Sequence, residues 1–174
     1  FRLANRSENG FKSRWFQRSL DQLDTSYERM PVPASFNDIT ERREIRDFSG
    51  WVWYDRNFFV PPTWKDGAIL LRFGSVNYLA SVYVNGKFAV NHTGGHLPFE
   101  ADVSKLVHLG ANNHISVAVN NVLSAHTLPP GSVYTKQDSR KHGTFTEVSP
   151  SFDFFNYAGI HRSVLLSFVP KIRV

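Results

Sequence analysis

The chain has 174 residues, enough for one domain with a sizeable core, and it contains no cysteine, which excludes disulfides and thiolate metal sites. Its apolar share of 41% is typical of a globular protein, and no apolar run approaches the ~20 residues of a membrane helix. The net charge of +5 comes from basic residues scattered among acids, without a zinc finger, RNA-binding signature or phosphate loop, so nucleic acid is not an expected partner.

The first third of the chain predicts short helices and turns. Apolar residues recur near helical spacing between Glu8 and Leu20, which favours a short helix or turn there. Met30 to Pro33 must be extended, because proline disfavours helix at the residue before it. A turn is expected over Ser35 to Asp38, with Asp38 capping a short helix over Ile39 to Asp47.

From Gly50 onward the sequence is typical of strands. Trp51 to Val60 is β-branched and aromatic, and Pro61-Pro62 ends it. Trp51 and Trp53 should share one face of that strand, either packed in the protein or exposed as a sugar platform. Ala68 to Phe73 is a second apolar run of strand length.

Asn85-Gly86 gives the clearest local signal, because both residues accept positive φ and favour a type I′ hairpin. The hairpin predicts three cross-strand pairs: Val84 with Lys87, Tyr83 with Phe88 and Val82 with Ala89.

Two later segments alternate as strands do. Ile115, Val117 and Val119 predict a half-buried strand, and Val164 to Phe168 predicts the last one. Between them, Ser124 to Ser151 breaks the rhythm and reads as a long, functional or packed loop. We therefore expect an all-β fold, an antiparallel jelly-roll β-sandwich like the galactose-binding domains, with short helical segments near the N-terminus and one domain over residues 1–174.

The segment from Phe152 to Val164 is rich in both aromatic and polar groups. Phe152, Phe154, Phe155 and Tyr157 surround Asp153, and an amide, a glycine, a histidine and an arginine follow. Aromatic faces stack on the C–H faces of sugars, and a carboxylate accepts hydrogen bonds from their hydroxyls. This composition favours carbohydrate as a ligand.

Four stretches carry a family resemblance: Met30 to Asp38 (MPVPASFND), Gly50 to Tyr54 (GWVWY), Gly94 to Asp102 (GGHLPFEAD) and Phe152 to Val164 (FDFFNYAGIHRSV). In these stretches the chain resembles the N-terminal sugar-binding domain of the β-glucuronidases in glycoside hydrolase family 2. They occur in the family's order and span most of the chain.

The resemblance implies an enzyme in three parts, with this jelly roll, an immunoglobulin-like domain and a catalytic TIM barrel. That enzyme hydrolyses the O-glycosyl bonds of β-D-glucuronides with retention, which needs two carboxylates about 5–5.5 Å apart. In the family both are barrel glutamates, one following an asparagine. This chain has no Asn-Glu dipeptide and is too short for a barrel of ~250 residues. We therefore expect a non-catalytic accessory domain that supports the barrel and completes its sugar pocket.

The same resemblance assigns substrate contacts. The aspartate matching Asp153 hydrogen-bonds hydroxyls of the bound sugar, whereas the plainer interpretation is a turn carboxylate satisfied by backbone N–H groups. Phe154 and Tyr157 are candidates for stacking on sugar or for packing in the core or an interface. Asn156 is a further candidate contact, and with Gly159 it is expected to shape the loop.

Other polar residues are assigned structural roles. We expect a structural hydrogen bond for His161 and an ion pair for Arg162. Gly94-Gly95-His96 lacks the lysine and helix of a phosphate loop. Glu100 and Asp102 share a strand face, where turn hydrogen bonds and a domain contact are favoured over a cation. Neither a metal site nor a cofactor is expected.

Asn5 and Asn91 begin N-x-S/T sequons and are glycosylation candidates in a secretory setting. The resemblance implies a lysosomal or secreted protein, although no signal peptide is visible in the given chain. The expected partners are a glucuronide-type sugar and the remaining domains of a glycoside hydrolase or further copies of this chain, with no membrane. Two alternatives stay open: a free-standing lectin-like module and a ligand-free interaction scaffold.

Overall fold

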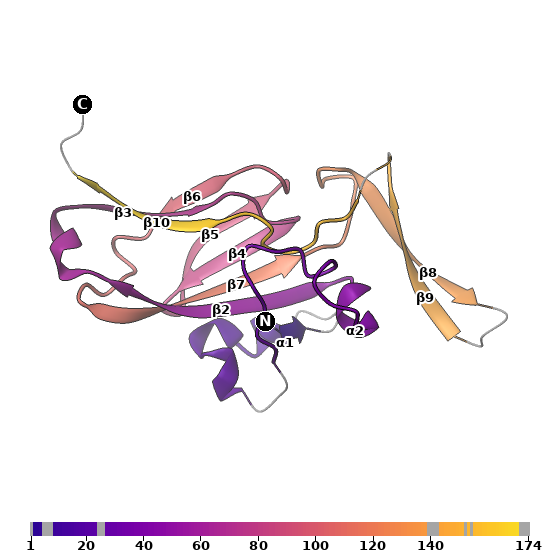
Figure 1. Cartoon of the computed structure of the whole chain (residues 1–174), viewed down its shortest axis with the longest axis horizontal. Coiled ribbons are helices and arrows are strands. Elements are labelled where there is room, and N and C mark those ends of the chain that lie inside the picture. The colour runs from indigo at the N-terminus through magenta and orange to yellow at the C-terminus, as the bar shows by residue number, and fades with distance from the viewer. Residues whose placement is uncertain are drawn as a thin grey trace.

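Two antiparallel sheets stacked face to face form the body of the molecule (Figure 1). The computed structural model describes residues 2–4, 9–23, 27–138, 143–151, 153 and 155–170. The five-stranded sheet has the order β1 (Arg2–Ala4), β2 (Trp51–Val60), β7 (Ala111–Asn120), β4 (Leu79–Val84), β5 (Lys87–Thr93). The three-stranded sheet has the order β10 (Val164–Pro170), β3 (Gly67–Phe73), β6 (Phe99–Asp102). This arrangement confirms the predicted all-β sandwich.

The helices are short. They are α1 (Asn9–Lys12), η1 (Trp15–Gln17), η2 (Leu20–Gln22), α2 (Arg43–Arg46) and η3 (Pro62–Asp66). None of the helices in the described part of the chain is long and apolar enough to span a membrane. The predicted helix over Ile39 to Asp47 was too long, and its expected cap was wrong. Asp38 lies in the turn, and the helix starts only at Arg43, after Arg42 as its N-cap residue. Thr40 Oγ1 accepts a 3.2 Å hydrogen bond from the N–H of Arg42 just before the helix.

The main core lies between the sheets, and a second cluster covers the outer face of the five-stranded sheet. In that second cluster Trp15 and Leu20 pack on Trp53 and Ala118. Trp53 is fully buried, so the tryptophans of β2 are packing residues and not a sugar platform. The prediction of a half-buried strand over 115–119 was also wrong, because residues 116–119 are buried on both faces beneath the N-terminal segment.

The β4–β5 hairpin turns at Asn85-Gly86, whose φ angles are 50° and 75°. The predicted pairs Val84–Lys87 and Tyr83–Phe88 are present, but Val82 pairs with Val90 and not with Ala89. A bulge shifts the register between Val82 and Tyr83. Local turn chemistry thus sets the first two pairs, and the bulge decides the third.

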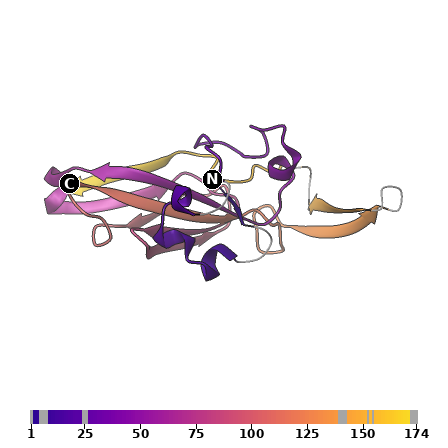
Figure 2. The ribbon, with the colours of Figure 1, turned by 90° about the horizontal axis from the view of Figure 1, so that it is seen from below.

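A second hairpin replaces most of the predicted loop between Ser124 and Ser151. Strands β8 (Gly131–Asp138) and β9 (Gly143–Pro150) pair with each other in a separate sheet. They extend away from the sandwich as an arm (Figures 1 and 2). The chain then returns through residues 151–163 to β10.

Candidate functional site

The return segment, residues 151–163, lies against the stretch that follows Pro33. The N–H of Ala34 donates to the carbonyl of Ile160 at 3.0 Å, and that of Phe36 donates to the carbonyl of Ala158 at 3.1 Å. The N–H of Ala158 donates in turn to Asn37 Oδ1 at 3.0 Å. Two of the four stretches that carried the resemblance are therefore neighbours in space.

Asn77 is the buried anchor of this segment. Its Nδ2 donates to the carbonyl of Tyr157 at 2.7 Å, and its Oδ1 accepts from the N–H of His96 at 2.9 Å. Its backbone forms a bridge with Gly159, with the Asn77 N–H donating at 3.0 Å. One fully buried amide side chain thus joins the return segment to the Gly94–His96 turn.

Tyr78 adds a second anchor. Its hydroxyl donates to Oδ1 of Asn156 at 2.5 Å, and Tyr78 itself is fully buried. The contact gives Asn156 a role in holding the segment, and a sugar contact through the same side chain stays a prediction.

Gly159 adopts the conformation expected of it. Its φ is +103°, and a Cβ built on it would lie 2.4 Å from Tyr54 Oη and 3.1 Å from Phe36 Cδ1. Both the backbone angle and the space therefore require glycine.

Asp153 is exposed. Within the described ranges its carboxylate has no hydrogen bond or ion pair, so the turn contacts of the plainer interpretation are not formed. Its carboxylate is accessible to a ligand. Phe154, the next predicted contact, lies outside the described residues.

Aromatic rings continue the surface beyond Asp153. Tyr157 is 41% exposed and stacks on His161, with ring centroids 6.0 Å apart and planes at 21°. Phe155 is 52% exposed, and its ring centroid lies 4.9 Å from that of Tyr157. Leu97 and Leu128 are also exposed, and both lie next to the Gly94–His96 turn. The ring of His96 in this turn contacts the ring of His161. Phe155 and Tyr157 thus form an exposed apolar platform, close in sequence to the exposed Asp153.

The predictions for His161 and Arg162 were wrong. The buried Nδ1 of His161 has no hydrogen-bond partner in the described part of the chain, because its neighbours are the rings of Tyr157 and His96. Arg162 has no ion pair there either, and its Nη1 donates to the carbonyl of His96 at 3.4 Å. Burial, together with the charges of His96 and Arg162, lowers the pKa of His161 to about 4.

The Gly94–His96 turn is structural. The N–H groups of Gly94 and Gly95 both donate to the carbonyl of Tyr78, so they do not point at an anion. Glu100 and Asp102 share the exposed face of β6 as predicted. Within the described ranges, no group of three or more His, Asp or Glu side chains is placed to hold a metal ion.

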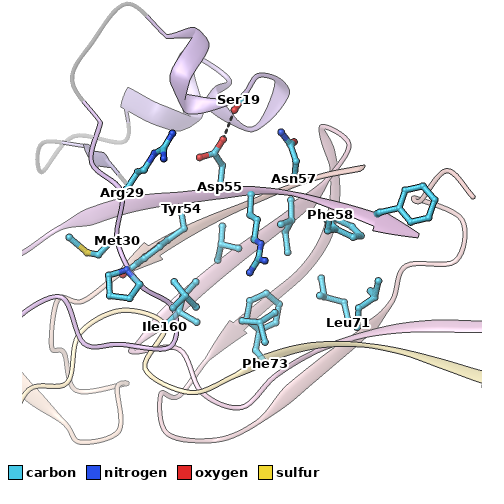
Figure 3. Close-up of a pocket in the computed structure, with 18 of the residues that line it drawn as sticks. Ser19, Arg29, Met30, Tyr54, Asp55, Asn57, Phe58, Leu71, Phe73 and Ile160 are labelled. Atoms are coloured by element: carbon cyan, nitrogen blue, oxygen red, sulfur yellow. Dashed lines mark hydrogen bonds between the residues drawn. The ribbon is translucent and has the colours of Figure 1, made fainter. Parts of the chain in front are cut away.

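A large cavity of about 1050 Å³ lies elsewhere, between β2 and the strands β3 and β10 (Figure 3). Ile160 lines one end of it, but Asp153 and Tyr157 do not. The candidate sugar contacts and the cavity are therefore separate features.

Comparisons with known proteins decide the family. Residues 5–170 match the family model described as "Glycosyl hydrolases family 2, sugar binding domain". The chain belongs to this family. It is 47% identical to the mouse β-glucuronidase in an alignment that covers 97% of this chain. It is 42% identical to the human β-glucuronidase in an alignment that covers 96% of this chain. In both cases it spans only 27% of the relative's length.

Solved β-glucuronidase structures contain a part with the same fold as this sugar-binding domain. The enzyme from an uncultured Clostridium is 44% identical, with a TM-score of 0.81 over 98% of this chain and 27% of its own. The Ruminococcus gnavus enzyme in complex with D-glucuronic acid is 37% identical, with a TM-score of 0.80 over 94% of this chain and 27% of its own.

Asn91, in the second sequon of this family 2 domain, is exposed on β5, an edge strand of the five-stranded sheet. Asn5, in the first sequon, lies outside the described residues. Glycosylation of either site stays a prediction.

Sequence reasoning found the segment that carries Asp153 but missed its anchors. Asn77 and Tyr78 contact residues about eighty positions away in sequence, at separations of 80 and 78. The available signal was the position of Asn77 and Tyr78, two hydrogen-bonding side chains directly before the apolar strand Leu79–Val84. That position does not indicate which residues they bind.

Proposed function

We propose that this domain acts as a non-catalytic part of a β-glucuronidase, in which Asp153 binds hydroxyls of the sugar that a catalytic domain cleaves. The observation that carries the proposal is the exposed Asp153 carboxylate, without a described partner, on a segment held by Asn77 and Tyr78. A charged acceptor held in place is well suited to two neighbouring hydroxyl groups.

The apolar platform supports the second half of the role. Phe155 and Tyr157 beside Asp153 offer surface that a sugar or a catalytic domain would cover. The chain itself lacks the Asn-Glu dipeptide of the catalytic acid/base. Chemistry is therefore assigned to the rest of such an enzyme, and positioning to this domain.

The test is Asp153→Ala in a full-length enzyme that contains this domain. Loss of a charged hydrogen bond of about 1.5–4 kcal/mol should lower kcat/KM by roughly ten- to a thousandfold on a β-glucuronide. Asp66→Ala, an exposed acid on η3, is the matched control and should leave kcat/KM unchanged. Unaltered kinetics in a folded Asp153→Ala enzyme would refute the role.

Two measurements on the purified chain address the alternatives. Micromolar binding of a free glycan by titration calorimetry would favour a lectin-like module. A stable complex with a protein partner without sugar would favour a scaffold. The proposed accessory role predicts weak or no binding of free glucuronate, because one carboxylate and a flat platform do not enclose a sugar.

A lysosomal or secreted location forms part of the same proposal. It rests on the likeness to the mammalian β-glucuronidases and on the exposed sequon at Asn91. Sensitivity of the secreted chain to a peptide N-glycosidase, lost in Asn91→Gln, would test it.

A further inference from the structure

The bulge in the β4–β5 hairpin places Phe88 and Asn91 on the same face of the five-stranded sheet. In an unbroken strand, residues three apart point to opposite faces. Here Phe88 lies opposite Tyr83 and Asn91 lies opposite Ser81, and the register shifts between these two pairs. Tyr83 and Ser81 are two apart on β4, and Tyr83 packs on the cluster that covers the outer face of the sheet. Phe88 and Asn91 are therefore successive outward positions of β5, about 7 Å apart along the strand.

The burial of the sequon agrees with this register. Asn91 and Thr93 are exposed, whereas His92 between them is half-buried. The ring of His92 stacks on Phe99 of β6, with centroids 4.4 Å apart and planes at 12°. Within the described ranges the side-chain amide of Asn91 has no hydrogen bond. Its Nδ2 is therefore open to modification, and the hydroxyl of Thr93 on the same face completes the acceptor sequence.

Phe88 offers an open aromatic ring beside this amide. It is 54% exposed, and its ring meets that of Tyr83 edge-on, with centroids 5.9 Å apart and planes at 74°. Phe16 of η1 stacks on Tyr83 in turn, with centroids 4.2 Å apart and planes at 12°. We call these three residues the outer aromatic cluster. Phe16 and Tyr83 are partly buried, so they hold the ring of Phe88 in place while about half of its surface stays exposed.

We propose that Asn91 carries an N-linked glycan whose first N-acetylglucosamine stacks on Phe88 and covers the outer aromatic cluster. The apolar C–H face of a sugar ring packs on an aromatic face. Attachment to Asn91 keeps the sugar at a high effective concentration beside Phe88, so one aromatic ring suffices where a free sugar would need an enclosing pocket. The glycan rests on the secretory or lysosomal location that is part of the proposed function, but it is independent of the role of Asp153.

The modification is a group transfer from a lipid-linked oligosaccharide pyrophosphate, the donor that a secretory compartment supplies. Nδ2 of Asn91 loses one proton and forms a bond to C1 of N-acetylglucosamine, while the bond from C1 to the pyrophosphate oxygen breaks. The lipid pyrophosphate leaves with the electron pair of that bond. The outward neighbours of the new linkage along β5 are Phe88 and Thr93, and of these two only Phe88 is aromatic.

The experiment uses the whole chain with an added secretion signal in a eukaryotic cell, so that it does not depend on the native location. Mass spectrometry should find Asn91 occupied. The glycosylated chain should have a Tm about 2–4 °C above that of Asn91→Gln. An endoglycosidase that leaves a single N-acetylglucosamine should preserve this difference, because only the first sugar reaches Phe88. In NMR spectra the C–H protons of that sugar should shift upfield, because they lie over an aromatic face.

Phe88→Ser should remove both the Tm difference and the upfield shift in the glycosylated chain. Phe59→Ser is the matched control: Phe59 is 56% exposed, but it lies on β2, with β7 and β4 between it and β5, and its loss should leave both effects in place. If Phe88→Ser does not fold, the upfield shift in the wild-type chain decides.

Three results would overturn the proposal. The first is an equal Tm difference in Phe88→Ser, or an unshifted sugar in the wild-type chain. The second is an unmodified Asn91 in the secreted chain. The third is micromolar binding of a free N-acetylglucosamine disaccharide to Asn91→Gln, which would make the outer aromatic cluster a lectin site. None of these results depends on the kinetics of Asp153→Ala, so the two proposals can fail independently.

Discussion

The hydroxyl of Tyr78 donates a 2.5 Å hydrogen bond to Oδ1 of Asn156 and so connects the buried start of β4 to the segment that carries Asp153. The N–H of Tyr78 also donates to the carbonyl of Asn120 at the end of β7, at 2.8 Å. Burial raises the pKa of the Tyr78 hydroxyl, which keeps it a donor across the physiological range. The position of the exposed carboxylate therefore depends on the sandwich interior.

Tyr78→Phe should lower the free energy of unfolding by about 1–2 kcal/mol, because Asn156 loses its donor at a partly buried site. Urea denaturation measures the loss, and faster amide exchange at Ala158 and Gly159 should accompany it. Tyr134→Phe, which removes an exposed hydroxyl on the β8–β9 arm, should change neither quantity. Loss of stability with unchanged exchange in residues 155–160 would show that the hydroxyl does not hold the segment.

The sequence predicted those parts of the fold that local chemistry decides. Asn85-Gly86 sets its hairpin through its own backbone preferences, and the proline pair ends β2 through its missing donors. The double burial of β7 was not predictable in this way, because it depends on Trp15 and Leu20 folding over the outer face of the sheet. Alternation shows that a strand has two faces but not what covers them.

The same limit applies to the candidate site. Asp153 and its aromatic neighbours are adjacent in sequence, so composition alone indicated a ligand surface. The anchoring by Asn77 arises from residues that the topology brings together.

Gly159→Ala should destabilise the domain by more than about 2 kcal/mol, because a side chain at φ +103° is strained and its Cβ would lie 2.4 Å from Tyr54 Oη. Gly110→Ala is the control: its φ is also positive, at +69°, but the nearest atom to its Cβ would be 3.5 Å away. It should cost about 1 kcal/mol. Equal losses in the two variants would mean that the close contact at Gly159 does not matter.

A double-mutant cycle separates the two causes at Gly159. Tyr54→Phe removes the hydroxyl that the new Cβ would approach, so Gly159→Ala should cost less in that background than in the wild type. The backbone strain remains in both backgrounds. Strict additivity of the two unfolding free energies would exclude the clash as a contributor.

Acid should weaken the ring cluster around His161. Its pKa is lowered from 6.5 to about 4 by burial and by the charges of His96 and Arg162, so the folded state favours the neutral imidazole. That contribution to stability is present above pH 6.5 and is lost as the pH falls toward 4. After allowance for solvent screening it amounts to about 1 kcal/mol, or a fall of about 2–4 °C in Tm.

His161→Phe retains a ring against Tyr157 but cannot titrate, so its Tm should fall less between pH 6.5 and 4 than that of the wild type. His126→Phe changes an exposed histidine and should follow the wild-type profile. His92 and His96, whose pKa values burial also lowers, account for any slope that remains in His161→Phe. Parallel profiles for wild type and His161→Phe would contradict the assignment.

Asp55 fastens the N-terminal segment to the five-stranded sheet. Its Oδ2 accepts from Ser19 Oγ at 2.8 Å and from the N–H of Leu20 at 2.9 Å, and it lies 3.2 Å from His114 Nε2. Burial alone would raise the pKa of Asp55, but the hydrogen bonds from His114, Leu20 and Ser19 lower it overall. The ionised carboxylate is thus the form that the fold prefers.

Asp55→Asn should therefore lower the free energy of unfolding by about 1–3 kcal/mol near neutral pH. It should also speed tryptic cleavage at Arg14 and Arg18, because the segment that covers Trp53 would open more often. Because the folded pKa lies below 3.8, the difference from wild type should be complete above that pH and shrink as the pH falls further. Asp66→Asn, at an exposed site on η3, should alter neither cleavage nor stability. Unchanged cleavage in Asp55→Asn would mean that apolar packing on Trp53 alone holds the N-terminal segment in place.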